Sequence, residues 1–547
     1  MSQISQKRFR GLEAVAELLR RAGVDTAFGL LGGSNAAWVA HAVNIGQLRF
    51  IRTRHEETAV TAAAGYSRAT GGLGVCTTTK GPGFTNAVNA LIAAARGHVP
   101  LLHITGQGMK AKPLGSSQEV DQAALAKIAG IGYHVVRELS ELEETFWTAA
   151  RAALHNGQPQ ALSLGDHWFD QHIELTQEET RPLRPDLAPD TDSVRAVIDE
   201  LAIAKKPLIL AGWGAVLADA HSSLIALAEV SGARLTTTLR ANHFFNGHAR
   251  DLGLCGSWSP QVVRQIINDC DLVLSFGASL TKQTTEAGAI FGGAKLVQCE
   301  IDDQSKFHAS SPELFLLGDA RMAAEMLLAE WKRRDLQNRP APQPGPDAKT
   351  IKASFLKADL GSDPARGLDP RAVYAALDRI FPPGRIVVTD NGRFIVTIPS
   401  LIEARDAKSW LVGNAYGSIG LGLGAAIGAA VAHPDRPVVL VTGDGGFAMA
   451  AQELSAIRGA GIDNITIAII NDECYGSDIK YLRRFGLPQT VLHQTLPDIE
   501  GLARVYGGAG HLITSVDALE KVDFSGPGPT LLDIRVDPEV NVRDALN

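Results

Sequence analysis

Residues 436–476 read RPVVLVTGDGGFAMAAQELSAIRGAGIDNITIAIINDECYG, and this stretch carries the strongest indication of the fold. Pro437–Val441 is an apolar, β-branched run with the length of a buried strand. Phe447–Arg458 has a helical pattern, and Ile465–Ile470 repeats the strand pattern. The order strand, helix, strand predicts a βαβ unit whose two strands are parallel and near neighbours.

Two aspartates follow these strands. Asp444 lies in the turn Gly443-Asp444-Gly445-Gly446, and Asp472 comes directly after the second strand. Open α/β sheets bind ligands at the carboxyl ends of their strands, and paired carboxylates there suit Mg²⁺ or Ca²⁺. The glycines let backbone N–H groups approach phosphate oxygens at a helix N-terminus. An isolated GDG would be read as a tight turn, but the second acid favours a metal–diphosphate site.

This stretch resembles the thiamin-diphosphate (ThDP) binding motif, which begins with GDG and ends near an Asn pair. It is most similar to the acetolactate synthase-like branch, which shares Gln452-Glu453-Leu454. The resemblance implies that Asp444 and Asp472 bind Mg²⁺ through their side chains and Cys474 through its carbonyl. The family usually has Asn at position 472. Further cofactor contacts are implied for Gly443, Gly445, Gly446, Tyr475 and Gly476.

The composition is that of an ordinary α/β protein. The 547 residues are 45% hydrophobic and 20% charged, and the formal charge of −7 gives no electrostatic reason to expect nucleic acid. Five scattered cysteines without metal or redox spacing suit a reducing compartment. The N-terminus lacks an apolar signal core, and we expect a cytoplasmic protein. Val412–Ala432 is uncharged but rich in Gly and Ala, so we expect a buried helix and no membrane span.

The length suggests about three domains. Strand-like and helical segments alternate in each part, which predicts three doubly wound, parallel-sheet α/β domains. We place them at residues 1–176, 192–333 and 367–547, separated by the Pro-rich linkers Thr176–Thr191 and Arg334–Lys349. The resemblance makes the first a pyrimidine-binding domain, the second a central Rossmann-like domain and the third a diphosphate- and Mg²⁺-binding domain.

In the first domain, Glu56 and Glu57 stand where the strand Arg49–Arg52 gives way to the helix Glu56–Thr70. Read alone, they are first-turn acids that complement the helix dipole. However, Arg-His-Glu before Gly65-Tyr66-Ser67-Arg68-Ala69 resembles the segment that bears the cofactor-activating glutamate of ThDP enzymes. That role maps to Glu56, where a carboxyl group would share a proton with the aminopyrimidine.

Three other segments of the first domain match the family in order. Gly81-Pro82-Gly83-Phe84-Thr85-Asn86 resembles a loop near the active site, and Leu31-Gly32-Gly33-Ser34 resembles a Pro-Gly-Gly turn. Gln118 matches a glutamine that reaches toward the cofactor. The resemblance therefore adds Gly33 and Asn86 as cofactor contacts and Gln118 as a catalytic residue.

In the third domain, Thr389–Phe394 follows the expected strand Ile386–Val388 and matches the diphosphate-contacting turn of the family. Asn391, Gly392 and Arg393 are the implied contacts, although relatives often have Gln-His at positions 393 and 394. Gly417-Ser418-Ile419-Gly420 matches the segment that holds the aminopyrimidine through main-chain bonds. Gly417 and Ile419 are the candidates there, with Ile419 as the apolar wedge that keeps the cofactor bent.

Substrate choice is not decided by these motifs. Asp478 falls where the pyruvate decarboxylase-like branch has a catalytic glutamate, and it either donates a proton or faces solvent. The paired His-His of that branch is missing from the first-domain sequence. In the central domain, Ser279 stands where acetolactate synthases have a flavin-contacting arginine, which leaves open whether this domain binds FAD, ADP or nothing.

The resemblance implies a ThDP- and Mg²⁺-dependent enzyme that decarboxylates a pyruvate-like 2-keto acid and transfers the acyl-carbanion equivalent to a second carbonyl. A homodimer or homotetramer is implied, with active sites at the subunit interface. One alternative is a decarboxylase or lyase of the benzoylformate or oxalyl-CoA type, which uses no acceptor. Another is a non-catalytic ThDP-binding subunit, which retention of Glu56, Asp444 and Asp472 disfavours. A dinucleotide-binding oxidoreductase has less support, because no Gly-x-Gly-x-x-Gly closes a leading strand.

Overall fold

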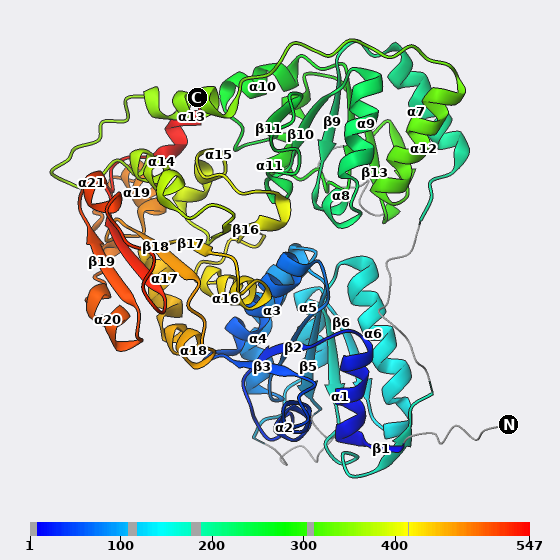
Figure 1. Ribbon diagram of the computed structural model, residues 1–547, viewed down its shortest axis with the longest axis vertical. Helices are drawn as coiled ribbons and strands as arrows, with labels where there is room; N and C mark the ends of the chain where they lie inside the picture. The colour runs from blue at the N-terminus through cyan, green and yellow to red at the C-terminus, as the bar shows by residue number, and fades with distance from the viewer. Residues whose placement is uncertain (1–7, 108–116, 177–186, 304–310, 414, 547) are drawn as a thin grey trace.

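The structure is a computed structural model that describes residues 8–107, 117–176, 187–303, 311–413 and 415–546. Its strands form three six-stranded sheets and a small two-stranded ribbon. Every pair of neighbouring strands in the three large sheets is parallel. Figure 1 shows the first domain in blue and cyan, the central domain in green and the third in yellow to red. The expected architecture of three parallel-sheet α/β domains is confirmed.

The first domain has the strand order β3-β2-β4-β5-β7-β6. Its strands are β2 (Thr26–Gly29), β3 (Arg49–Arg52), β4 (Gly74–Thr77), β5 (Leu101–Gly106), β6 (Gly132–Val136) and β7 (Gln160–Leu164), and its helices are α1 (Gly11–Arg21), α2 (Ala36–Asn44), α3 (Glu56–Thr70), α4 (Pro82–Arg96), α5 (Gln122–Ala129) and α6 (Leu142–Asn156). The ribbon pairs β1 (Arg8–Arg10) with β8 (His172–Glu174) in antiparallel fashion.

The central domain has the order β11-β10-β9-β12-β13-β14. Its strands are β9 (Pro207–Ala211), β10 (Arg234–Thr237), β11 (Asp251–Leu254), β12 (Leu272–Phe276), β13 (Lys295–Glu300) and β14 (Leu314–Leu317), and its helices are α7 (Thr191–Ile203), α8 (Trp213–Leu217), α9 (His221–Ser231), α10 (Gln261–Asn268), α11 (Lys282–Thr285) and α12 (Ala320–Arg333).

The third domain has the order β16-β15-β17-β18-β20-β19. Its strands are β15 (Ile386–Thr389), β16 (Trp410–Val412), β17 (Val438–Gly443), β18 (Ile465–Asn471), β19 (Ala509–Ile513) and β20 (Thr530–Arg535), and its helices are α13 (Ala348–Lys357), α14 (Pro370–Ile380), α15 (Ile398–Leu401), α16 (Gly422–Ala432), α17 (Asp444–Ala450), α18 (Leu454–Gly459), α19 (Ile479–Arg484), α20 (Ile499–Val505) and α21 (Val516–Leu519).

The predicted βαβ unit is confirmed, because β17 and β18 are parallel neighbours and pair from Val438↔Ile465 to Gly443↔Ile470. The connecting helix differs from its prediction. It begins at Asp444 and is interrupted by a 3-10 turn, Ala451–Glu453, before α18. The early start follows from Gly443 as N-cap and from the acidic side chain of Asp444 in the first turn, which complements the helix dipole.

The helix expected over Val412–Ala432 is shorter than predicted. Of the described residues in this range, only Gly422–Ala432 are helical, because Gly417 and Gly420 have φ of 92° and 87°, conformations that interrupt a regular helix before α16. No helix within the described ranges is both long and apolar enough to cross a membrane. All five cysteines are buried and none forms a disulfide.

The two expected linkers differ in how much of them is described. Most of Thr176–Thr191 lies outside the described residues, and α7 begins at Thr191. Residues 336–347, all within the described part of the chain, carry no helix or strand. Phe355 of α13 then packs in the third-domain core.

The first and third domains meet where α3 crosses α16, which lie side by side near the centre of Figure 1. The crossing is made backbone to backbone by glycines. A Cβ at Gly65 would overlap the backbone of Ala425, and one at Gly428 would overlap the carbonyl of Ala62. One apolar cluster spans both domains and joins the residues of α3 to those of α16. Contact this close requires residues without side chains at these positions.

We therefore predict that Gly65→Ala destabilises the protein, although alanine is the better helix former by about 1 kcal/mol. The added methyl group must push α3 away from α16, and overpacking of this kind costs about 1–3 kcal/mol. Thermal unfolding should show a midpoint several degrees below that of the unaltered chain.

Gly72→Ala is the matched control. A Cβ there would meet only the Thr70 hydroxyl, at 3.5 Å, so its midpoint should stay close to that of the unaltered chain. Equal midpoints for the two variants would contradict the tight crossing.

Candidate active site

Asp444 and Asp472 lie beside each other at the carboxyl edge of the third sheet. Asp444 is the first residue of α17, and Asp472 follows the last residue of β18. β17 and β18 are hydrogen-bonded neighbours, so their ends deliver both carboxylates to one place. Asp444 is 4% exposed, and the Asp472 side chain is 8% exposed. The structure thus brings together the two acids that the sequence singled out.

The Asp444 carboxylate is only half satisfied. Its Oδ1 accepts a hydrogen bond from the Gly445 N–H at 2.9 Å, whereas Oδ2 is buried without a hydrogen bond, although the nearby Gln494 side chain favours the charged form of the carboxylate. Burial and the negative charge of Asp472 raise the pKa of Asp444 to about 6. Burial also raises the pKa of Asp472, and the positive charge of Arg393 opposes that shift. An unpartnered buried oxygen beside a second carboxylate is a donor set that fits a hard divalent cation.

Cys474, the third expected ligand, lies in the turn after Asp472. Its N–H donates to Asp472 Oδ1 at 3.2 Å, and its carbonyl accepts from the Gly476 N–H at 2.9 Å. Within the described ranges, no three His, Cys, Asp or Glu side chains gather as a metal site. A cation here would therefore rest on the two carboxylates, a backbone carbonyl and oxygens from outside the chain. Tyr475 is 43% exposed beside this turn.

Asp390, which directly follows β15, organises the loops around this edge. It is 1% exposed and accepts hydrogen bonds from the N–H groups of Asn391 (2.7 Å) and Gly420 (2.9 Å) and from Thr442 Oγ1 (3.1 Å). A Cβ at Gly446 would approach its Oδ2 at 2.6 Å. Burial raises the pKa of Asp390 to about 6. One buried carboxylate thus ties together the ends of β15 and β17, the start of α17 and the loop before α16.

Asn391 joins the turn after β15 to the loop before α16, and both segments carry candidate cofactor contacts. Its amide donates to the carbonyls of Gly413 (2.9 Å) and Ser418 (2.6 Å). Gly417 is exposed and Ile419 is half-buried. Gly392 is packed against the Phe394 ring, which a Cβ there would overlap.

Arg393 makes a contact that the sequence did not predict. Its guanidinium forms an ion pair with Asp472, and its Nη1 donates to the carbonyl of Pro538 at 2.7 Å. The motif match placed Arg393 at the diphosphate, but the structure places it against the expected metal ligand. No local sequence signal links positions 393 and 472, since they follow different strands.

In the first domain, Glu56 is the first residue of α3 and is 8% exposed. The Asn86 amide, from α4, donates to Glu56 Oε2 at 3.0 Å. Two residues matched separately from the sequence are therefore in direct contact. The neighbouring Glu57 accepts from the Asn89 amide, and Asn89 Oδ1 in turn accepts from Ser418 Oγ at 2.8 Å. Asn89, which the sequence reasoning missed, links α3 to the loop that carries Gly417 and Ile419.

Glu453 makes a second link between the domains. It is fully buried in the turn between α17 and α18, and its carboxylate accepts the Arg54 N–H at 3.1 and 3.0 Å. Arg54 stands two residues before Glu56. Glu453, in the turn that follows α17, therefore supports the start of α3.

The remaining first-domain candidates lie around Gly81. Gly81 has φ of 64° and donates its N–H to Gln122 Oε1 at 2.9 Å. The backbone of Gln118 lies so close that a Cβ at Gly81 would overlap the Gln118 carbonyl. Gln118 and Gly33 are exposed.

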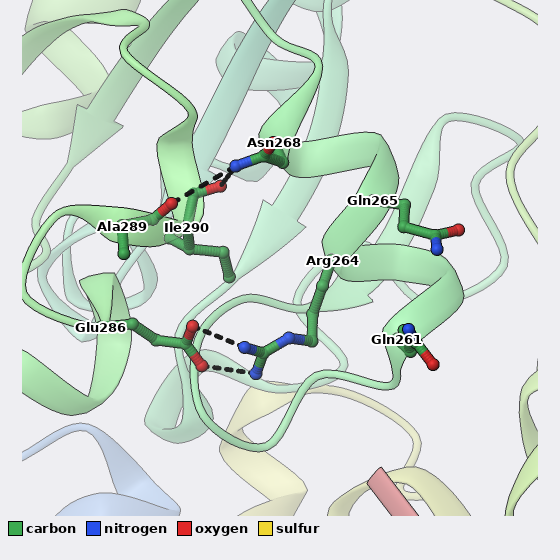
Figure 2. Close-up of a pocket in the computed structure, with 7 residues that line it drawn as sticks. All are labelled: Gln261, Arg264, Gln265, Asn268, Glu286, Ala289 and Ile290. Carbon is green, nitrogen blue, oxygen red and sulfur yellow. Dashed lines mark hydrogen bonds and ion pairs between the residues drawn. The ribbon is translucent and has the colours of Figure 1, made fainter. Parts of the chain in front are cut away.

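Asp478 ends the 3-10 turn that begins at Gly476, and its N–H donates to the Tyr475 carbonyl at 3.0 Å. Asp478 is exposed, at the start of α19. Figure 2 shows a pocket of about 230 Å³ on the central domain, where Arg264 is paired with Glu286 and the Asn268 amide donates to the carbonyls of Ala289 and Ile290. None of the predicted site residues lines this pocket.

Comparison with protein families gives matches in all three domains. Residues 9–125 match "Thiamine pyrophosphate enzyme, N-terminal TPP binding domain", residues 194–327 match the central domain and residues 390–534 match the C-terminal TPP binding domain of the same enzymes. Thiamine pyrophosphate is another name for ThDP. These ranges together span most of the chain.

Relatives match nearly end to end. The chain is 30% identical to the acetolactate synthase large subunit of Parasynechococcus marenigrum, over 96% of this chain and 87% of the relative. It is 28% identical to the acetolactate synthase of Arthrospira platensis, over 97% and 94% of the two chains. It is 27% identical to the acetolactate synthase isozyme 1 large subunit of Escherichia coli, over 98% and 96%.

We predict that Asp444→Asn stabilises the cofactor-free protein at pH 7.5. The carboxyl pKa of Asp444 is raised to about 6 in the folded chain. The unaltered chain therefore keeps its full stability below pH about 4 and loses stability as the pH rises through about 6, because the buried carboxyl group ionises. Asparagine keeps the acceptor for Gly445 and carries no charge. The gain at pH 7.5 should be on the order of 1–3 kcal/mol and should shrink toward pH 5.

Thermal unfolding across this pH range measures the gain. Addition of Mg²⁺ should raise the midpoint of the unaltered chain and have little effect on the variant. A variant that is less stable than the unaltered chain at pH 7.5 would contradict the repulsion between the two aspartates.

Proposed function

The chain belongs to the thiamine pyrophosphate enzyme family, and from this we propose that it is a ThDP- and Mg²⁺-dependent carboligase. Its donor would be a small 2-keto acid such as pyruvate, which loses CO₂, and its acceptor a second carbonyl compound. The observation that carries the proposal is the pairing of buried Asp444 and Asp472 behind a glycine turn, in a chain that also buries Glu56 at a helix start. The similarity to acetolactate synthases supports acetolactate formation.

The third domain supplies the residues that would hold the cofactor. Asp444, Asp472 and the Cys474 carbonyl would bind Mg²⁺, and the backbone of Gly443, Gly445 and Gly446 would face the diphosphate. Asn391 would contact the diphosphate, and Gly417 and Ile419 would position the aminopyrimidine end. When bound, ThDP supplies the electron sink for cleavage of the carbon–carbon bond.

Glu56 is the proton-handling group of this proposal. Its carboxyl group is nearly buried, and the Asn86 amide fixes one of its two oxygens at 3.0 Å. A carboxyl group held in this way moves a proton at one defined oxygen, as general acid–base catalysis requires. The Glu453 carboxylate keeps the start of α3 in place, so it would position Glu56 without touching substrate.

The alternative without an acceptor has weaker support. Asp478, the residue that suggested a decarboxylase, is exposed, and it is its backbone N–H that donates to the candidate Tyr475, at the Tyr475 carbonyl, over 3.0 Å. We also propose that the enzyme is a homodimer or homotetramer with active sites between subunits. A cytoplasmic location is proposed too, because its five buried thiols are unpaired.

We predict that Glu56→Gln lowers pyruvate turnover at least about 100-fold, because glutamine cannot exchange the proton. CO₂ and acetolactate should be followed together, with ThDP and Mg²⁺ supplied. Glu57→Gln is the matched control on the next residue and should keep most of the activity.

Analysis of the products distinguishes carboligation from simple decarboxylation. Acetolactate formed in proportion to CO₂ and lost in Glu56→Gln supports the proposal. CO₂ without acetolactate would replace it with the decarboxylase alternative, and no consumption of pyruvate would rule out this donor.

Mixing two inactive variants tests the subunit interface. In dimers of Glu56→Gln chains with Asp444→Asn chains, a shared site would again contain both native residues. If the sites form between subunits, each mixed dimer has one native site of its two, so a random 1:1 mixture, in which about half of the dimers are mixed, should regain about one quarter of the native activity. No recovery in proven mixed dimers would place each site within one chain.

A further inference from the structure

Arg393 and Asp472 form an enclosed ion pair at the expected cation site. Their side chains are 17% and 8% exposed. The second guanidinium nitrogen of Arg393 is fixed by the Pro538 carbonyl at 2.7 Å. Gly476 covers the pair, since a Cβ there would overlap both Asp472 Oδ2 and the Arg393 guanidinium. This arrangement holds the positive charge of Arg393 against Asp472 Oδ2. The other oxygen, Asp472 Oδ1, accepts a hydrogen bond from the Cys474 N–H.

The charges of the site explain the use of an arginine. Asp444 and Asp472 contribute two negative charges when ionised, and the positive charge of Arg393 offsets one of them. The three side chains together then carry a net charge of minus one. The charge that Arg393 offsets is that of Asp472, the carboxylate with which its guanidinium is in contact.

We propose that Arg393 is a positioning residue that neutralises Asp472 and thereby sets the affinity of the site for its divalent cation. This inference rests on the proposed function, because it assumes that Asp444 and Asp472 bind the cation. A fixed guanidinium beside a ligand carboxylate opposes the approach of a second positive charge. Its removal should therefore tighten cation binding, whereas loss of a purely structural contact would weaken binding or leave it unchanged.

The test is the affinity for Mn²⁺ alone, without ThDP, measured from the electron paramagnetic resonance signal of free Mn²⁺. Arg393→Gln should bind at least tenfold more tightly than the unaltered chain. Arg393→Lys keeps the charge and should stay within threefold. Arg379→Gln is the matched control, because Arg379 pairs with Glu520 on the surface of the same domain and should have no effect.

A second comparison keeps the proposal testable if Arg393→Gln does not fold. Asp472→Asn should bind Mn²⁺ at least tenfold more weakly, because Arg393 is left without its counter-charge. Adding Arg393→Gln to that variant should restore the affinity to within threefold of the unaltered chain.

Two results would overturn the proposal: a folded Arg393→Gln with unchanged or weaker Mn²⁺ binding, or a double variant no better than Asp472→Asn. Either result would leave the proposed function standing as long as the unaltered chain binds Mn²⁺. An unaltered chain that binds no Mn²⁺, with or without ThDP, would instead contradict the proposed function itself.

Discussion

The close crossing of α3 and α16 is the constraint on which the rest of the structure depends. At Gly65 and Gly428 the two helices touch through their backbones, so their separation is fixed by the absence of side chains. α3 begins with Glu56, and α16 follows the loop of Gly417 and Ile419, so this one contact relates candidate residues of two domains. The Glu453 and Asn89 hydrogen bonds flank the crossing and fix the start of α3 and that loop. This packing feature thus fixes where the candidate residues of the first and third domains lie within one chain.

The carboxyl edge of the third sheet buries acidic side chains, whereas the core around it is apolar. Asp390 and Asp444 are both nearly buried, and burial raises the pKa of each to about 6. Asp390 is satisfied by three donors and serves the architecture, whereas Asp444 keeps an unpartnered oxygen beside Asp472. A buried group that lacks a partner lowers stability, and such groups concentrate where a ligand is bound. The ion pair with Arg393 supplies Asp472 with a counter-charge, so of Asp444 and Asp472 only Asp444 lowers stability in this way.

Sequence patterns predicted the three sheets because buried parallel strands are short β-branched runs, such as Ile465–Ile470, that need no distant information. They also predicted that Asp444 and Asp472 meet, since that follows from parallel pairing alone. The extent of α16 was overestimated, because apolar composition does not reveal the positive φ of Gly417 and Gly420. Contacts between residues far apart in the chain, Arg393 with Asp472 and Arg54 with Glu453, had no local pattern to indicate them. They depend on loop conformations that only the folded chain defines.

Calorimetric titration of ThDP into metal-free protein, with and without Mg²⁺, tests the central claim most directly. The claim is that the buried aspartate pair makes this chain a ThDP-binding protein through a divalent cation. We expect saturable binding of about one ThDP per chain when Mg²⁺ is present and little binding when it is chelated. Equal binding in both conditions would contradict the role of Asp444 and Asp472. No binding to the folded protein under either condition would contradict the claim altogether.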